Sequence, residues 1–173
     1  MATLVIKTAA ELIDLDLEDR WRRRRAARDT AVSRYILQTF LDQGGPIPVD
    51  RIVSAFRDEP AATIHDALVA LDDDDLIRVR EGRVDIAYPF ATSPTAFIVR
   101  ILGGNERYTC CAIDALGVAP MIGQRVEIRS QCHHCGVPLT FPATPRGVGP
   151  DAGGVMVWFG KRVDERSKVF DTL

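Results

Sequence analysis

The stretch Arg107-Tyr-Thr-Cys-Cys-Ala-Ile-Asp-Ala-Leu116 concentrates side chains that can attack, bind a metal or move a proton. Together with a second piece, Gln131-Cys-His-His-Cys-Gly136, it holds all four cysteines and two of the three histidines of the 173-residue chain. The first piece has the character of a short helix. The second is a turn between two expected strands, one at 124–130, where apolar and polar residues alternate, and its partner at 137–141. We therefore expect an α+β module around these two pieces, and any chemistry should take place there.

Upstream of this module the sequence predicts three helices and a hairpin. Apolar residues recur at helical spacing in three segments. Two strand-like segments follow, separated by a tight turn. This order is typical of a winged-helix domain. The expected elements are a helix capped by Thr30 and ended by Gly44, a short helix from Pro48, a helix over Ala61–Leu71, and a hairpin of Leu76–Arg80 with Val84–Tyr88.

Winged-helix domains usually read DNA with a helix that supplies basic or amide side chains to base edges. The candidate helix here, Ala61–Leu71, contains no Arg or Lys, and Asp72–Asp75 follow it directly. Four carboxylates would repel phosphates, and the formal net charge of the whole chain is −2. We therefore expect this domain to be a scaffold and do not expect a nucleic-acid partner.

The fold class predicted is α+β, with an N-terminal winged-helix-like helical domain followed by a small mixed or antiparallel β module with short helices. The expected domains are a charged helical segment at 1–29, the winged-helix-like domain at 30–90 and the α+β module at 91–173. In the first segment the basic run Arg20–Arg25 is interpreted as a solvated helix face that pairs with the acidic turns before it.

No targeting or membrane segment is expected in this sequence. No apolar run approaches the roughly 20 residues that span a bilayer, and the N-terminus lacks the apolar core of a secretion signal. These features predict a cytoplasmic protein without a membrane partner. Because thiols stay reduced in that compartment, clustered cysteines favour metal binding or thiol chemistry over disulfides.

The chemistry of the first piece depends on where its helix begins. Thr109 is a natural N-cap, which would place Cys110 and Cys111 in the first turn, where the helix dipole favours thiolate over thiol. Asp114, three residues after Cys111, would share its helix face. A thiolate beside a carboxyl is a nucleophile or soft-metal ligand with a proton carrier at hand. The alternative is a small buried cysteine and an aspartate paired elsewhere.

The second piece has the two-residue spacing of a zinc knuckle between Cys132 and Cys135. A structural zinc site normally needs a second such pair, so a site would combine these two cysteines with Cys111 and one histidine, His134 or His133. Zinc, copper and mercury are the metals that such a cluster would hold. The alternative is that Cys132 is a core thiol at a strand end and the histidines face water.

These pieces resemble the organomercurial (alkylmercury) lyases. That family's signature has a Cys-Ala-Leu-Asp-like segment, a Pro-x-Leu-Ile-Gly turn, and a strand that ends in a Ser-x-Cys-x-x-x-Gly-x-Pro loop. The matching stretches are Tyr108–Leu116, Pro120–Cys132 and Gly136–Pro138, and the resemblance extends back through residues 46–70. An ordered run of matches from Cys111 to Pro138 makes the signature fairly specific.

The resemblance implies roles for three residues. Cys111 matches the cysteine that binds the mercury of the substrate, Asp114 matches the aspartate that helps deliver a proton to the leaving carbon, and Cys132 matches a cysteine usually seen as structural. The family's second catalytic cysteine corresponds to Gly153–Gly154, and no cysteine follows Cys135. A second thiol would then come from another cysteine of this chain or from a cellular thiol.

Three functions follow as hypotheses. The first is a lyase that cleaves a carbon–mercury or related carbon–heteroatom bond of a small-molecule substrate, with Cys111 and Asp114 as catalytic residues. The second is a non-catalytic protein that binds zinc, copper or mercury through Cys111, Cys132, Cys135 and His134. The third is a winged-helix regulator that senses a metal through this cluster, which the acidic helix disfavours. The sequence implies no organic cofactor and leaves the oligomeric state open.

Overall fold

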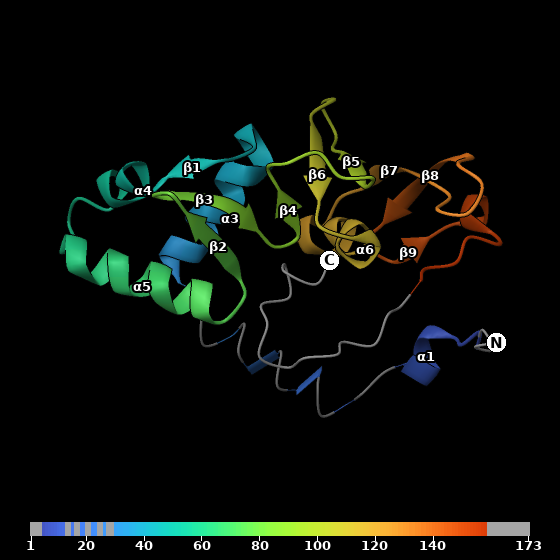
Figure 1. Cartoon of the computed structure of the whole chain (residues 1–173), viewed down its shortest axis with the longest axis horizontal. Helices are drawn as coiled ribbons and strands as arrows, with labels where there is room; N and C mark the ends of the chain where they lie inside the picture. The colour runs from blue at the N-terminus through green and yellow to red at the C-terminus, as the bar shows by residue number, and fades with distance from the viewer. Residues whose placement is uncertain are drawn as a thin grey trace.

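The computed structural model describes residues 5–12, 15, 18–19, 22–23, 26 and 30–158. Through this part of the chain runs a nine-stranded sheet, with helices packed along it (Figure 1). The predictions for 161–173, and for four of the six residues of the Arg20–Arg25 run, lie outside the described residues.

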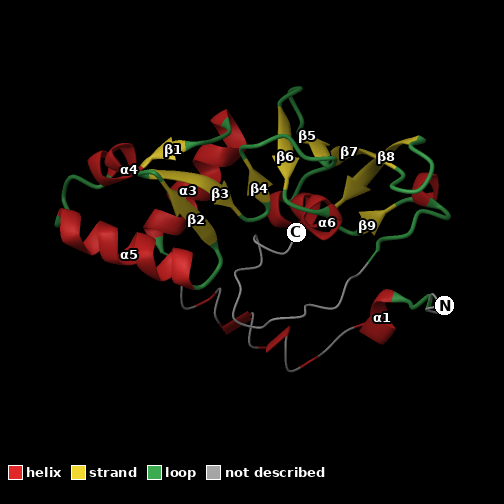
Figure 2. Cartoon of the chain, in the orientation of Figure 1, coloured by secondary structure: helices red, strands yellow, loops and turns green. Residues whose placement is uncertain are grey.

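Figure 2 shows helices and strands along the length of the molecule. The helices are α1 (Ala9–Leu12), α3 (Ala31–Gln43), α4 (Val49–Ala55), α5 (Ala61–Asp73) and α6 (Ala112–Ile122), with a 3-10 turn at Pro150–Ala152. The strands are β1 (Ile47–Pro48), β2 (Ile77–Arg80), β3 (Arg83–Ala87), β4 (Phe90–Ala91), β5 (Ile98–Arg100), β6 (Glu106–Thr109), β7 (Val126–Gln131), β8 (Pro138–Thr144) and β9 (Gly147–Val148). Their order in the sheet is β1-β3-β4-β6-β5-β7-β8-β9, with β2 paired to β3, and every pair is antiparallel.

The three helices expected between Thr30 and Leu71 are confirmed. Thr30 caps α3 in a reciprocal arrangement: its hydroxyl accepts from the Ser33 N–H at 3.2 Å, and the Ser33 hydroxyl accepts from the Thr30 N–H at 3.0 Å. Helices α4 and α5 follow, and β2 and β3 form the expected hairpin. The order of elements is therefore as predicted, while the winged-helix assignment itself stays a prediction.

One hydrophobic core joins the two halves of the chain. Strand β4 pairs with β3 on one side and with β6 on the other, and its Phe90 is fully buried. Core residues extend from Val32 in α3 to Ala143 in β8. The Arg107 guanidinium in β6 also donates to the carbonyl of Phe40 in α3, at 2.7 Å. The domain boundary expected at residue 90 thus lies inside a continuous sheet, and the division into domains stays a prediction.

Two expectations for the C-terminal half are wrong. Tyr108 and Thr109 belong to strand β6 and not to a helix, because β6 pairs with both β4 and β5. Val155–Trp158, the described part of the final strand expected at 155–159, pairs with no strand among the described residues, and Trp158 is 78% exposed. The α+β fold class is nevertheless confirmed. None of the helices in the described part of the chain has both the length and the apolar character needed to cross a bilayer.

Candidate active site

Strand β6 and helix α6 place Cys111 at the junction between sheet and helix. Strand β6 ends at Thr109, and Cys111 is itself the N-cap residue of α6, with extended backbone angles of φ −150° and ψ −179°. The helix buries Ala115, Val118 and Ala119 and packs against β7 and β8. Thr109 is therefore not the cap, and the expectation that Cys110 and Cys111 lie in the first helical turn is wrong by one to two residues.

The backbone before Cys111 is held by partly buried hydrogen bonds. The Thr95 hydroxyl donates to the Thr109 carbonyl at 2.8 Å and accepts from the Phe97 N–H at 3.1 Å. The Cys110 N–H donates to the Pro89 carbonyl at 3.1 Å. Thr109 itself is fully buried. These contacts fix the turn from which both adjacent thiols project.

The Cys111 thiol and the Asp114 carboxyl form a half-buried, hydrogen-bonded pair. Burial raises the pKa of Cys111 to about 11, although hydrogen bonding from the backbone of Asp114 acts against the increase. Burial likewise raises the pKa of Asp114 above its ordinary value, and its hydrogen bonding with Cys111 opposes that shift. The pairing expected from the spacing is present. Desolvation outweighs the effect of the N–H groups at the helix start, so the pKa of the Cys111 thiol moves in the direction opposite to the one expected.

Cys110 and Tyr88 complete the surroundings of this pair. Burial, and then the charges of Asp114 and Cys111, raise the pKa of the Cys110 thiol far above its usual range. Burial, and then Cys110, likewise raise the pKa of the Tyr88 phenol. The Tyr88 hydroxyl oxygen is buried and has no hydrogen-bond partner within the described part of the chain. Sequence reasoning missed Tyr88, and its position after β3 gives no motif from which it could have been found.

A cavity of about 300 Å³ opens beside Cys110. Its wall combines apolar side chains such as Ile86 and Pro94 with an ion pair between Arg78 and Asp85, whose charged atoms are 2.6 Å apart. The cavity therefore offers both an apolar surface and fixed charges within reach of a thiol, as small-molecule sites commonly do.

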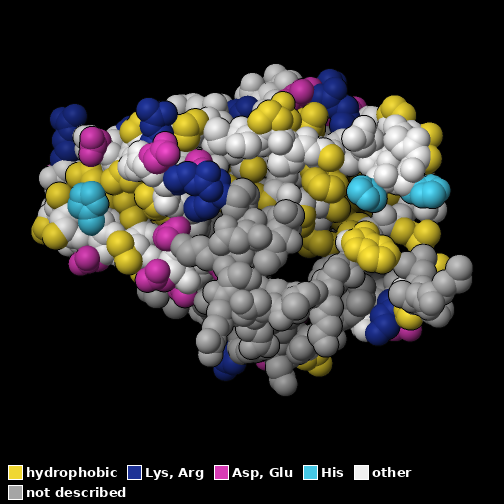
Figure 3. Space-filling view, in the orientation of Figure 1, with side chains coloured by type: hydrophobic (Ala, Val, Ile, Leu, Met, Phe, Trp, Pro, Cys, Tyr) yellow, Lys and Arg dark blue, Asp and Glu magenta, His cyan; other side chains and the backbone are white. Residues whose placement is uncertain are grey.

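The second cysteine piece forms the turn between β7 and β8. Hydrogen bonds from the backbone of Cys135 and of His134, and then from the Cys135 side chain, lower the pKa of Cys132. Cys132 is partly exposed, and His134 and Cys135 are exposed. Figure 3 shows histidine side chains on the surface at the end of the molecule opposite α5.

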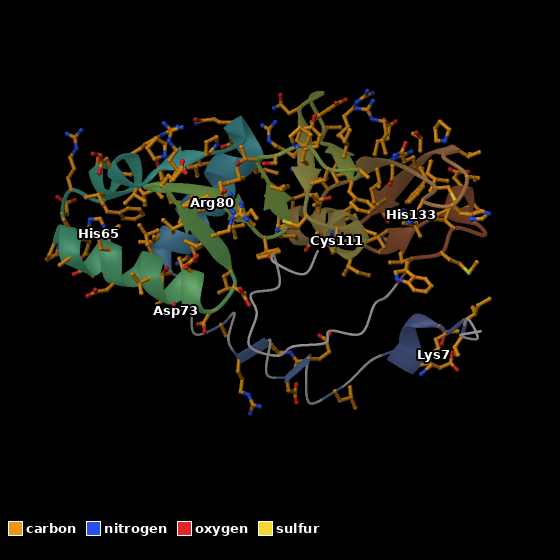
Figure 4. The ribbon with its side chains drawn as sticks, viewed as in Figure 1. Lys7, His65, Asp73, Arg80, Cys111 and His133 are labelled. Carbon is orange, nitrogen blue, oxygen red and sulfur yellow. The ribbon has the colours of Figure 1, made fainter. Side chains whose placement is uncertain are left out.

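The predicted metal ligands lie in two separate groups. Figure 4 labels Cys111 near the middle of the molecule, and His133 further along the sheet. In the described part of the chain no three histidine, cysteine or carboxylate side chains are arranged to hold a metal ion together. The structure thus places Cys132, His134 and Cys135 in one turn, and it places Cys111 beside Asp114. It does not bring Cys111 together with the three residues of the turn as ligands of one metal ion.

Fold and site together define a small α+β protein that presents a half-buried thiol–carboxyl pair at the start of a helix, beside a second thiol and a cavity. Comparison with known proteins agrees with this description. The family model described as "Alkylmercury lyase" matches residues 90–173. Curated alkylmercury lyases of Staphylococcus epidermidis and Streptomyces lividans are each 30% identical, over 109 and 112 residues, which is 63% and 65% of this chain.

The chain spans about half the length of these curated relatives, 48% and 49% respectively. A solved structure, described as the mercury-bound form of MerB2, superposes with a TM-score of 0.54 at 22% identity and covers 69% of this chain and 59% of that chain. At this identity the superposition shows the fold alone. The segment from residue 90 onward matches the alkylmercury lyase family, and the resemblance seen in the sequence is confirmed.

Proposed function

We propose that this protein cleaves the carbon–mercury bond of organomercurials, with Cys111 as the mercury ligand and Asp114 as the proton donor. The observation that carries the proposal is the contact between these two half-buried groups at the start of α6. The match to the alkylmercury lyase family supplies the reaction class.

The protonation of the pair suits this chemistry. Mercury is a soft metal that thiolates bind well, and metal binding displaces the thiol proton. The Cys111 thiol therefore loses its proton as the sulfur–mercury bond forms and the original ligand of mercury leaves. The raised pKa of Asp114 favours its protonated form. Asp114 then gives a proton to carbon, the electron pair of the carbon–mercury bond becomes the new carbon–hydrogen bond, and the thiol proton can restore Asp114.

Cys110 is the thiol that we propose as the second mercury ligand. It is the neighbour of Cys111 in sequence, it interacts electrostatically with both Cys111 and Asp114, and it faces the cavity. Additional thiolate donation to mercury should weaken the carbon–mercury bond toward protonation. The cavity has room for a small organic group beside this sulfur.

The test is release of the hydrocarbon from an organomercurial, such as benzene from a phenylmercury salt, in the presence of excess monothiol. We expect Cys111→Ser to abolish both turnover and tight binding of the organomercurial. Asp114→Asn should keep binding and lose turnover by about a hundredfold or more, because a general acid contributes 10²–10⁴ in rate. An equal loss of binding and turnover in Asp114→Asn would instead make Asp114 a ligand or a structural residue.

Two further variants complete the experiment. Asp66→Asn removes an exposed carboxylate on α5, away from the proposed site, and should leave turnover unchanged. Cys110→Ser should slow turnover while Cys111 still binds the organomercurial. Full activity of Cys110→Ser would show that the second thiol comes from solution or from another cysteine.

A further inference from the structure

The turn from Cys132 to Gly136 is closed by backbone hydrogen bonds. The Cys132 N–H donates to the Val137 carbonyl, and the Gly136 N–H donates to the Cys132 carbonyl, both at 2.8 Å. Gly136 has a φ of +71°, a conformation that other residues adopt only with strain. The two cysteines are therefore held at the two ends of a defined turn whose backbone is anchored by β7 and β8.

The two thiols of this turn lie close together. Backbone N–H groups of His134 and Cys135 are directed at the Cys132 sulfur, and the Cys135 side chain hydrogen-bonds it. Neither thiol is in a disulfide, and Cys135 is exposed. No third histidine, cysteine or carboxylate in the described residues joins them as a metal ligand. Zinc takes four ligands in structural sites, so two thiolates on their own suit a soft cation that needs only two.

The strand register places this turn at the same end of the sheet as the candidate active site. Ile98 of β5 pairs with Tyr108 of β6 on one side and with Arg129 of β7 on the other. Because β6 and β7 are both antiparallel to β5, they run in the same direction. Cys111 lies three residues beyond Tyr108, and Cys132 three beyond Arg129. Two strand spacings, roughly 10 Å, separate the two strand axes.

We propose that Cys132 and Cys135 form a second thiol site, separate from Cys111, that binds inorganic mercuric ion as a two-coordinate dithiolate. We assign this site the role of receiving the mercury that carbon–mercury cleavage releases. That role rests on the proposed function. Two sulfur–mercury bonds form as the two earlier ligands of mercury leave. The two thiol protons pass to solvent when those ligands are chlorides, or to the departing sulfurs when they are thiolates, so nothing is oxidised or reduced. The exposed position of Cys135 leaves the bound ion open to exchange with other thiols.

The test uses mercuric chloride, and no organomercurial, on the full chain carrying Cys110→Ser and Cys111→Ser. After dialysis against excess monothiol we expect one mercury per chain, with two sulfur neighbours by X-ray absorption and two protons released. Adding Cys135→Ser, which alters an exposed side chain, should weaken retention about a hundredfold, because the chelate is lost. His134→Ala in the same background is the matched control and should retain mercury.

Mercury retained at full strength after Cys135→Ser, or lost in His134→Ala, would overturn the two-thiolate site. Circular dichroism of each variant checks that the fold persists. Because the probe is inorganic and the active-site thiols are absent, this outcome does not depend on whether the protein cleaves organomercurials. Failure of wild-type cleavage with intact mercuric binding would refute the proposed function and, with it, the role of the turn as a product site.

Discussion

Burial and the start of a helix act on the Cys111 sulfur in opposite directions. The N–H groups at the beginning of α6 favour a thiolate, and desolvation favours the neutral thiol. Desolvation prevails, and the thiol rests beside a carboxyl whose own pKa is also raised. A protein that kept a free thiolate here would be exposed to oxidation and alkylation. In the function proposed above, the neutral thiol is activated when a thiophilic metal displaces its proton.

The raised pKa of Cys111 predicts a loss of stability at alkaline pH. Between the ordinary thiol pKa, about 8.5, and the folded-state value of about 11, the unfolded chain binds fewer protons at this site than the folded chain. The free energy of unfolding should therefore fall as pH rises through this window. The urea concentration at the unfolding midpoint, measured at several pH values in this window, should decrease less steeply with pH in Cys111→Ser than in the wild type.

Asp66→Asn is the control for this titration, because it removes an exposed carboxylate on α5, outside the buried pair and the turn with Cys132 and Cys135. It should keep the wild-type slope. A Cys111→Ser slope identical to the wild type would contradict the assignment of a buried, protonated thiol at this position.

Some of the site was predictable from spacing, and some was not. The pairing of Cys111 with Asp114 follows from helical periodicity, which is a local property. The protonation state depends on burial, which the sequence does not reveal at a single residue. Tyr88 reaches the site because β4 pairs with both β3 and β6, a non-local consequence of the sheet.

At the scale of elements, the junction between β6 and α6 is the part of the fold that positions Cys111 and Asp114. It contains no regular structure at Cys110 and Cys111, so its geometry depends on hydrogen bonds from outside the junction. Thr95 supplies two of them, to Thr109 and Phe97. A hydroxyl that satisfies one carbonyl and one N–H at once is costly to remove.

Thr95→Val should therefore lower the free energy of unfolding by about 1–3 kcal/mol, because it leaves the Thr109 carbonyl and the Phe97 N–H without this partner. Urea denaturation provides the measurement. Thr92→Val is the matched control: the Thr92 hydroxyl oxygen is buried and has no hydrogen-bond partner among the described residues. Its replacement should be neutral or stabilising, and a loss in Thr92→Val as large as in Thr95→Val would refute this account.

The elements that the sequence predicted are those with several periods of an apolar pattern. Helices α3 and α5 and the strands β7 and β8 all have enough residues to show one. Strands β1, β4 and β9 have two residues each and therefore no alternation to detect. Val155–Trp158 has a strand-like composition, but composition alone cannot provide a neighbouring strand.

At the scale of the whole molecule, the continuous sheet argues that the halves on either side of residue 90 unfold together. The cores of both halves form one cluster, and Phe90 lies within it, fully buried. Arg107 adds a direct link by donating to carbonyls at the end of α3. Two domains that merely follow each other in sequence would share few such contacts.

Val99→Ala tests this coupling from one half to the other. Val99 in β5 is fully buried, and truncating it should lower stability by on the order of 2 kcal/mol. If the molecule unfolds as one unit, native-state hydrogen exchange should show the same decrease in the free energy of opening for the most protected amides of α3, in the opposite half. Val69→Ala, at a 58% exposed position on α5, makes the same chemical change outside the core and should leave both halves unaffected. A loss confined to β5, β7 and β8 would instead establish the two halves as independent domains.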